Sequence, residues 1–128
     1  MSFFPQFFAP DPDIPTLHFA LHALGFPDAP RAQKLLRSLA KTEEELAALG
    51  EIFDDLLENL SRSAEPPRAL LNFSNLCDAA PDRAALFARL RQNPTALARL
   101  ARLFSWSQAL SDSVIRSPDA LEIAFDGG

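Results

Sequence analysis

Apolar residues recur three and four positions apart along most of this chain, and prolines or capping residues interrupt the pattern at short intervals. The clearest stripe consists of Leu46, Leu49, Phe53, Leu56, Leu57 and Leu60. This spacing is typical of an amphipathic α-helix, whereas the strict alternation of a half-buried strand and the turns of a hairpin are missing from the sequence. The sequence therefore predicts an all-α fold, with about seven or eight mostly short helices in an irregular bundle.

Capping signals indicate where these helices begin. Thr42 opens a capping box, in which its oxygen accepts from the amide three residues on and the glutamate there reaches back. Asn93 and Ser117 each precede a proline at the first helical position, where the missing N–H costs nothing. Ser105 or Ser107 is expected to cap a further helix. The expected helices cover residues 16–24, 28–39, 42–61, 68–79, 82–92, 94–104, 107–116 and 118–125.

Composition divides the chain into successive parts. Two consecutive prolines at positions 66–67 stop a helix and stiffen the connection, so they mark the strongest break. Prolines on both sides of Asp11 indicate an extended start. The expected parts are a Phe- and Pro-rich leader (residues 1–15), a segment of three helices (16–62), a second helical segment (68–125) and a short tail (126–128).

Charge and composition disfavour several classes of function. The net charge is −5, which makes the chain a poor general nucleic-acid binder. No apolar run approaches the roughly 20 residues that a membrane span needs, and the N-terminal residues lack the basic start of a signal peptide. Cys77 is the only cysteine and cannot form an internal disulfide, which fits a cytoplasmic location.

Three short patterns resemble parts of catalytic or metal sites, and each lacks an essential element. His18 and His22 share one helix face, but a catalytic zinc needs at least three protein ligands. Asp11 and Asp13 form a bare DxD sequence without the Gly-rich turn that would cradle phosphates. Ser113 lacks a G-x-S-x-G turn. We therefore expect no catalytic, metal-binding or cofactor-binding residue in this chain.

Arginine and leucine are interleaved at helical spacing between residues 83 and 104. This pattern is typical of amphipathic helices with basic outer faces, and it also suits a docking face for an acidic partner or a neighbouring domain. Trp106 and the four leader phenylalanines are more typical of packing, although the leader could instead dock onto a partner. The candidate residues for partner docking or packing are Arg89, Arg91, Arg99, Arg102, Trp106, Asp112 and Arg116.

Residues 66–125 contain a long pattern with fixed gaps. It starts at the Leu-Asn-Phe sequence of residues 71–73 and continues through Asn93, Pro94, Leu97, Leu100, Leu103, Phe104, Ser107, Leu110, Asp112, Ile115, Arg116 and Pro118. This pattern resembles the helical region near the amino terminus of the glutamine synthetase adenylyltransferase family, also called the glutamate–ammonia-ligase adenylyltransferases. The resemblance covers about half of the chain, and residues 1–65 do not contribute to it.

The resemblance implies a function for a longer protein. Members of the family carry two nucleotidyltransferase domains: one attaches AMP from ATP to a tyrosine of glutamine synthetase, and the other removes it by phosphorolysis. PII-type signal proteins and glutamine bias the two activities. ATP and magnesium are therefore expected for a full-length member, at a Gly-rich turn and paired carboxylates downstream of the helical region. This chain contains neither element, so we expect it to be a non-catalytic fragment, split-off domain or remnant.

The resemblance also suggests why serines lie between the leucines near the C-terminus. Small serines allow helices to approach closely, and Asp112 is expected to cap a helix or to pair with Arg116. The expected partner is a downstream nucleotidyltransferase domain or, indirectly, glutamine synthetase. A second hypothesis is a free-standing helical protein-interaction module, with the basic stretch or the leader as its contact surface. An autonomous enzyme is the least supported interpretation.

Overall fold

The computed structural model describes residues 3–126, and these residues form helices and connections without any strand. The predicted all-α fold is therefore confirmed. Ten helices occur where about seven or eight were expected, because the leader contains a short helix and the predicted helix over residues 42–61 is divided. They are α1 (Phe4–Phe7), α2 (Ile14–Ala23), α3 (Ala29–Ser38), α4 (Glu43–Gly50), α5 (Phe53–Arg62), α6 (Pro66–Ala79), α7 (Arg83–Gln92), α8 (Pro94–Trp106), α9 (Gln108–Arg116) and α10 (Pro118–Asp126).

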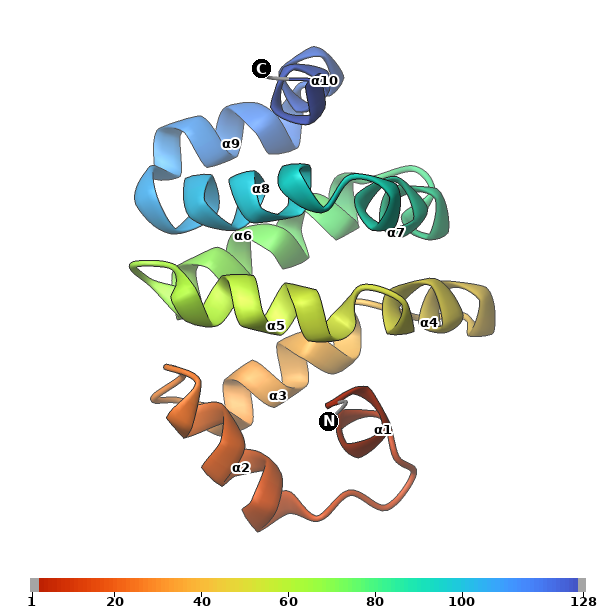
Figure 1. The fold of residues 1–128 in the computed structure, drawn as a ribbon, viewed down its shortest axis with the longest axis vertical. Coiled ribbons are helices and arrows are strands. Elements are labelled where there is room, and N and C mark those ends of the chain that lie inside the picture. Colours follow the sequence, from red (N-terminus) through yellow and green to blue (C-terminus); the bar gives the residue numbers. More distant parts are fainter. Residues whose placement is uncertain (1–2, 127–128) are drawn as a thin grey trace.

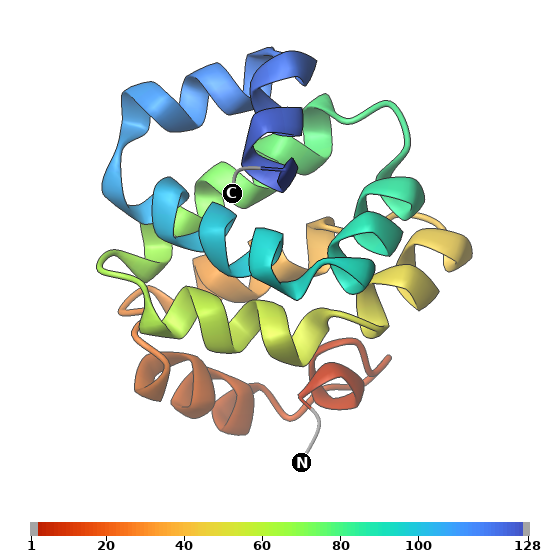
Figure 2. The same cartoon turned by 45° about the horizontal axis from the view of Figure 1, so that its top comes forward.

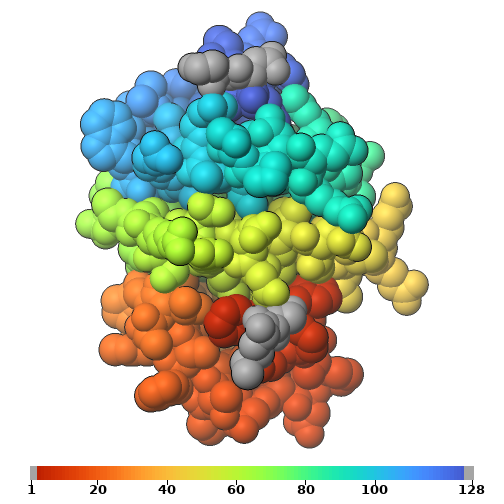
Figure 3. Space-filling model, viewed as in Figure 1, coloured from red at the N-terminus to blue at the C-terminus, as the bar shows by residue number. Residues whose placement is uncertain are grey.

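The helices are stacked along the long axis of the molecule roughly in chain order, from α1–α3 at one end to α9 and α10 at the other (Figure 1). Helix α6 is the central element, since it contacts α3, α5, α8 and α9. The turned view shows α8 crossing in front of α6, with α5 on one side and α9 on the other (Figure 2). The space-filling view shows α8 at the surface between α5 and α9 (Figure 3).

Buried apolar side chains from both ends of the chain form one core. It reaches from Phe7 on α1 to Phe125 on α10, so residues on both sides of the Pro66–Pro67 pair contribute to it. Burying a large apolar side chain stabilises a fold by roughly 1.5–3 kcal/mol, and the phenylalanines are the largest of these side chains. The most completely buried are Phe7, Phe26, Phe53, Phe73, Phe87 and Phe104.

The helix caps agree with the sequence prediction. The Asn93 side chain accepts from the amide of Ala96 at 3.1 Å, and the Ser107 hydroxyl accepts from Leu110 at 3.2 Å. Ser117 likewise accepts from the amide of the third residue after it. In the capping box, the hydroxyl of Thr42 accepts from the amide of the third residue after it, while that residue's carboxylate accepts from the Lys41 amide rather than from Thr42 itself. These contacts satisfy amides that the first helical turn leaves without partners.

The prediction of one helix over residues 42–61 is wrong. Helix α4 ends at Gly50 and α5 begins at Phe53, with Ile52 donating to the carbonyl of Leu49 in a tight turn between them. Glycine is a poor helix former and so provides a weak point for this turn. The turn lets α4 pack against α7 while α5 packs against α8. Tertiary packing of two different faces therefore overrides a continuous apolar stripe.

The Phe-rich leader is not simply extended, as the prolines suggested, because Phe4–Phe7 forms α1 and its rings are packed on α5. The ring centroids of Phe4 and Phe7 each lie 5.5 Å from that of Phe53, and Phe8 lies 5.3 Å from it. Gly50 makes room for this contact, since a Cβ built there would lie 3.1 Å from the Phe4 ring. Phe7 is therefore part of the core, and the other leader phenylalanines are partly buried against it.

Candidate interaction site

Two of the arginines predicted for docking or packing hold α10 in place. The guanidinium of Arg89 donates to both carboxylate oxygens of Glu122, at 2.7 and 3.0 Å, and lies 3.9 Å from the ring centroid of Phe125. Arg99 donates to the carbonyl oxygen of Ala124 at 2.7 Å. These donors meet carbonyl and carboxylate groups near the C-terminal end of a helix, where carbonyls lack helical partners. The hydrogen bonds from Arg89 also hold the pKa of Glu122 below its usual range.

The other predicted residues lie at more exposed positions. Arg91 forms a 3.6 Å ion pair with Glu51, and both side chains are exposed to solvent. Arg116 donates through Nε to the backbone carbonyl of Asp112 at 3.2 Å. The carboxylate of Asp112 instead accepts from the side-chain amide of Gln108 at 2.8 Å. Of the two expected roles of Asp112, capping or pairing with Arg116, the described contacts include no ion pair between the two side chains, and Arg116 instead bonds the Asp112 backbone.

Trp106, a candidate for partner docking or packing, is 73% exposed. It lies on the same side of α8 as Arg99 and Leu103, at positions that differ by three and four residues. Ile123 on α10 is 70% exposed and Leu110 on α9 is 46% exposed. We call the surface formed by Arg99, Arg102, Leu103, Trp106, Leu110 and Ile123 the α8–α10 face.

Two adjoining grooves hollow the α8–α10 face. One, of about 420 Å³, is lined by Leu103, Leu110 and Ile123. The other, of about 490 Å³, is lined by Trp106 and Arg102 together with residues at the end of α5. Both grooves include Arg99 and Leu103, so they form one continuous surface. A contiguous exposed apolar surface with a polar rim is typical of an interaction site.

The sequence pattern did not predict an amide network that joins the buried Asn72 to Gln108 at the surface. Asn72 on α6 is completely buried and donates to the carbonyl of Phe104 at 2.8 Å. Its side-chain oxygen accepts from Gln108 at 2.9 Å, and its amide nitrogen also donates to the Gln108 oxygen at 3.2 Å. This network joins the centre of α6 to the end of α8 and the start of α9. The available signal was the polar residue within the apolar Leu-Asn-Phe sequence of residues 71–73.

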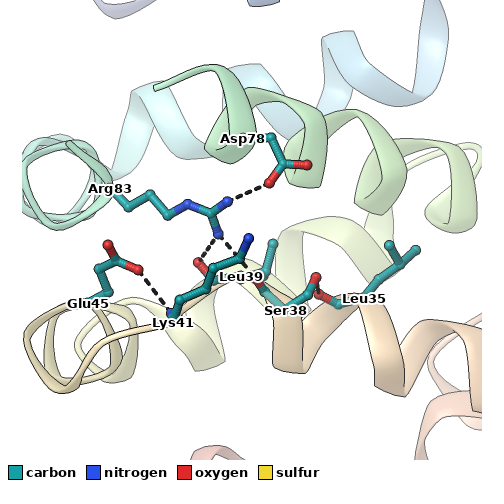
Figure 4. Close-up of polar contacts among 7 residues, drawn as sticks. All are labelled: Leu35, Ser38, Leu39, Lys41, Glu45, Asp78 and Arg83. Carbon is teal, nitrogen blue, oxygen red and sulfur yellow. Dashed lines mark hydrogen bonds and ion pairs between the residues drawn. The ribbon is translucent and has the colours of Figure 1, made fainter. Parts of the chain in front are cut away.

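A second polar contact fixes the C-terminal end of α6 relative to α3 and α7. Arg83, at the start of α7, donates to the carbonyls of Ser38 and Leu39 at 3.0 Å each and forms an ion pair with Asp78 (Figure 4). Its side chain is largely buried. Because the carbonyls at the end of α3 have no helical partners, the guanidinium serves as a cap supplied by another helix.

One histidine and one aspartate of the suspected motifs make structural contacts. His18 Nε2 lies 2.9 Å from the side-chain oxygen of Gln33 on α3. Asp13 accepts from the amide and hydroxyl of Thr16 at the start of α2. Among residues 3–126, no group of three His, Cys, Asp or Glu side chains is placed to hold a metal ion. No helix in that range is long and apolar enough to cross a membrane.

Cys77 is expected to resist thiol reagents in the folded protein. It is completely buried on α6, and burial raises the pKa of its thiol to about 12, against a smaller opposing effect of Arg83. The reactive thiolate is therefore negligible at neutral pH. We expect labelling by dithionitrobenzoate to follow the unfolding rate in native buffer and to be immediate in urea, with glutathione as the unburied control. Rapid native labelling of one thiol per chain would contradict this burial.

The fold and these surfaces define the chain as an all-α domain with an exposed apolar face that carries arginines. It matches curated proteins named bifunctional glutamine synthetase adenylyltransferase/adenylyl-removing enzyme. This chain is 34% identical to the Corynebacterium efficiens protein over 108 residues. It is 34% identical to the Corynebacterium glutamicum protein over 112 residues. The Streptomyces coelicolor protein is 32% identical over 108 residues. No family model and no solved structure matches the chain.

The chain belongs to the glutamine synthetase adenylyltransferase family, as the pattern in its second half predicted. The matches cover 84–87% of this chain but only 10–11% of the length of these relatives. A match of 108 residues is longer than residues 66–128, so the similarity also includes part of residues 1–65. The expectation that the resemblance covers only half of the chain is therefore wrong.

Proposed function

We propose that this chain is a non-catalytic helical part of a glutamine synthetase adenylyltransferase-type enzyme, situated on the amino-terminal side of a nucleotidyltransferase domain. The proposal rests on the difference between two shares: the matches include most of this chain but only about a tenth of each relative. The names of those relatives describe adenylylation of glutamine synthetase and removal of the adenylyl group. The helical part would serve that activity by positioning the domain that performs it.

The described residues do not fit a magnesium-bound ATP. Asp13 of the DxD sequence is engaged by Thr16 as the cap of α2. No group of His, Cys, Asp and Glu side chains within residues 3–126 is arranged as a metal site. The ATP and magnesium expected for a full-length family member are therefore assigned, in this proposal, to other parts of the enzyme.

Internal contacts make the described helices suitable as a rigid positioning element. The Asn72–Gln108 amide pair joins α6 to α9, and the Asn72 bond to Phe104 holds the end of α8. Arg89 and Arg99 secure α10 against α7 and α8. A surface built on helices fixed in this way can hold a neighbouring domain in one orientation, because its side chains cannot move independently of the core.

A chimeric enzyme tests this proposal. The matched segment of the Corynebacterium glutamicum enzyme would be replaced by this chain, and AMP attachment to glutamine synthetase and its removal would be measured. We expect the chimera to keep both activities, and a version without the segment to lose most of them. Circular dichroism and gel filtration would establish that both proteins fold.

Two controls make the chimera informative. An unrelated helical domain of similar length in the same position should behave like the deletion. This chain alone, given magnesium, ATP and glutamine synthetase, should transfer no AMP. Full activity of the deleted enzyme would contradict the proposal and favour a free-standing helical interaction module. Transfer of AMP by the isolated chain would contradict its non-catalytic role.

A further inference from the structure

The α8–α10 face combines exposed apolar side chains with an unusual local charge. The chain carries a net charge of −5, yet the residues that line the two grooves include Arg62, Arg99 and Arg102 and not one Asp or Glu. The side chain of Arg102 forms no hydrogen bond or ion pair within residues 3–126. Arg62 pairs with Glu58 at an exposed position. Arg99 donates to the neutral carbonyl of Ala124, and no carboxylate within the described residues is paired with it.

The shape of this face favours a helix as the occupant. Its apolar residues line two concave grooves with Leu103 between them. Ridges of side chains on one helix pack into grooves of this kind on others. An amphipathic helix laid across the face would place its apolar stripe against Leu103, Leu110 and Ile123. Residues beside that stripe would then approach the guanidinium groups at the rim, where carboxylates are the matching partners.

Other kinds of occupant fit less well. A membrane surface is flat and accommodates protruding side chains better than grooves between helices. A nucleic acid would meet mainly apolar lining here, and it binds through dense phosphate contacts that few arginines can supply. A second copy of this face would bring the same arginines against each other.

We propose that the α8–α10 face binds an amphipathic helix whose apolar stripe is flanked by Asp and Glu residues. The inference rests on the proposed function for the origin of that helix, which would belong to the remainder of the longer enzyme. Leu103, Leu110 and Ile123 supply the apolar contact, Trp106 closes one end, and Arg102 pairs with a carboxylate of the bound helix. The two arginine-rimmed grooves select for acidic over basic helices.

Trp106 offers a direct readout, because it is the only tryptophan in the chain and lies on the proposed surface. The probe is a synthetic helical peptide of about five turns, with leucines on one face and glutamates beside them. A matched peptide carries lysines in place of the glutamates. We expect a saturable blue shift of Trp106 emission with the acidic peptide, and binding at least about tenfold weaker for the basic one.

Variants of the face and of a distant surface complete the test. Arg102→Glu should reverse the preference between the two peptides, and Ile123→Asn should weaken binding of the acidic peptide by about tenfold. Phe19→Asn is the matched control, since Phe19 on α2 is 79% exposed and lies outside both grooves. It should leave binding unchanged. Circular dichroism would check that each variant is folded.

Several outcomes would overturn the inference. Equal binding of the acidic and basic peptides would show that charge does not determine the choice of helix. The absence of a saturable shift of Trp106 emission would show that the face does not bind such a helix. A shift produced by phosphatidylglycerol vesicles but not by the acidic peptide would assign the face to a membrane surface. None of these readouts involves AMP transfer, so a failure here leaves the proposed function intact. An inactive chimera would likewise not contradict peptide binding measured at the α8–α10 face.

Discussion

Replacing Phe53 with alanine is expected to lower the free energy of unfolding by about 3–5 kcal/mol. Phe53 is completely buried and occupies the meeting point of α1 and α5, with the rings of Phe4, Phe7 and Phe8 around it at centroid distances of 5.3–5.5 Å. The substitution removes a large buried ring and leaves a cavity that three other rings fill only in part. A typical domain has a total stability of about 5–15 kcal/mol, so the loss is a large fraction of it.

Urea unfolding followed by circular dichroism would measure the effect of Phe53→Ala. Phe53→Leu should cost distinctly less, since it keeps most of the buried volume. Phe19→Ala is the control, because its ring is exposed and its removal should change stability by less than about 0.5 kcal/mol. The loss of α1 packing should also make the leader the first site of proteolysis. A loss of stability no larger than that of Phe19→Ala would contradict the described position of the leader.

Replacing Asn72 with alanine is expected to cost about 2–4 kcal/mol. The buried carbonyl of Phe104 would lose its side-chain donor, and Gln108 would lose both of its contacts with Asn72. Buried polar groups without partners are costly because the protein interior cannot replace water. Since α8 and α9 meet at this network, we expect the α8–α10 face to lose its fixed geometry as well.

A double-mutant cycle would separate this network from simple loss of volume. The losses of unfolding free energy caused by Asn72→Ala and Gln108→Ala should be strongly non-additive in the double variant, because each substitution removes the same pair of amide contacts. Asn75→Ala is the matched control, since Asn75 lies on the same helix but is exposed. It should be close to neutral. Additive effects of the first two substitutions, within about 0.5 kcal/mol, would show that the amides do not act as a unit.

Much of the local structure could be predicted because its causes lie within a few residues of each other. Asn93, Ser107 and Ser117 cap their helices through the amide three residues later, so the sequence signal and the contact are the same feature. The family could also be inferred from the spacing of residues 93–118, and the matches to longer relatives bear it out. A pattern with many fixed gaps is rarely produced by chance.

The candidate site was harder to predict from local patterns. Arg89, Arg99 and Arg102 look alike in the sequence, yet the first two bond α10 through their guanidinium groups. The guanidinium of Arg102 bonds no group within residues 3–126. The sequence left both docking and packing open for Trp106, and the structure places its side chain at the surface. The difference arises because α10, which is distant in sequence, covers one part of the α7–α8 surface and leaves another part open.

Helix content, caps and family thus follow from the order of residues, since periodicity and capping act over one or two turns. The break at Gly50, the position of α1 on Phe53 and the burial of Asn72 do not follow from it. Each depends on which helices meet in space: α4 with α7, the leader with α5, and α6 with α8 and α9. Such contacts join residues far apart in the chain. Where they bury apolar surface or an amide, their free energy outweighs the local helix propensity.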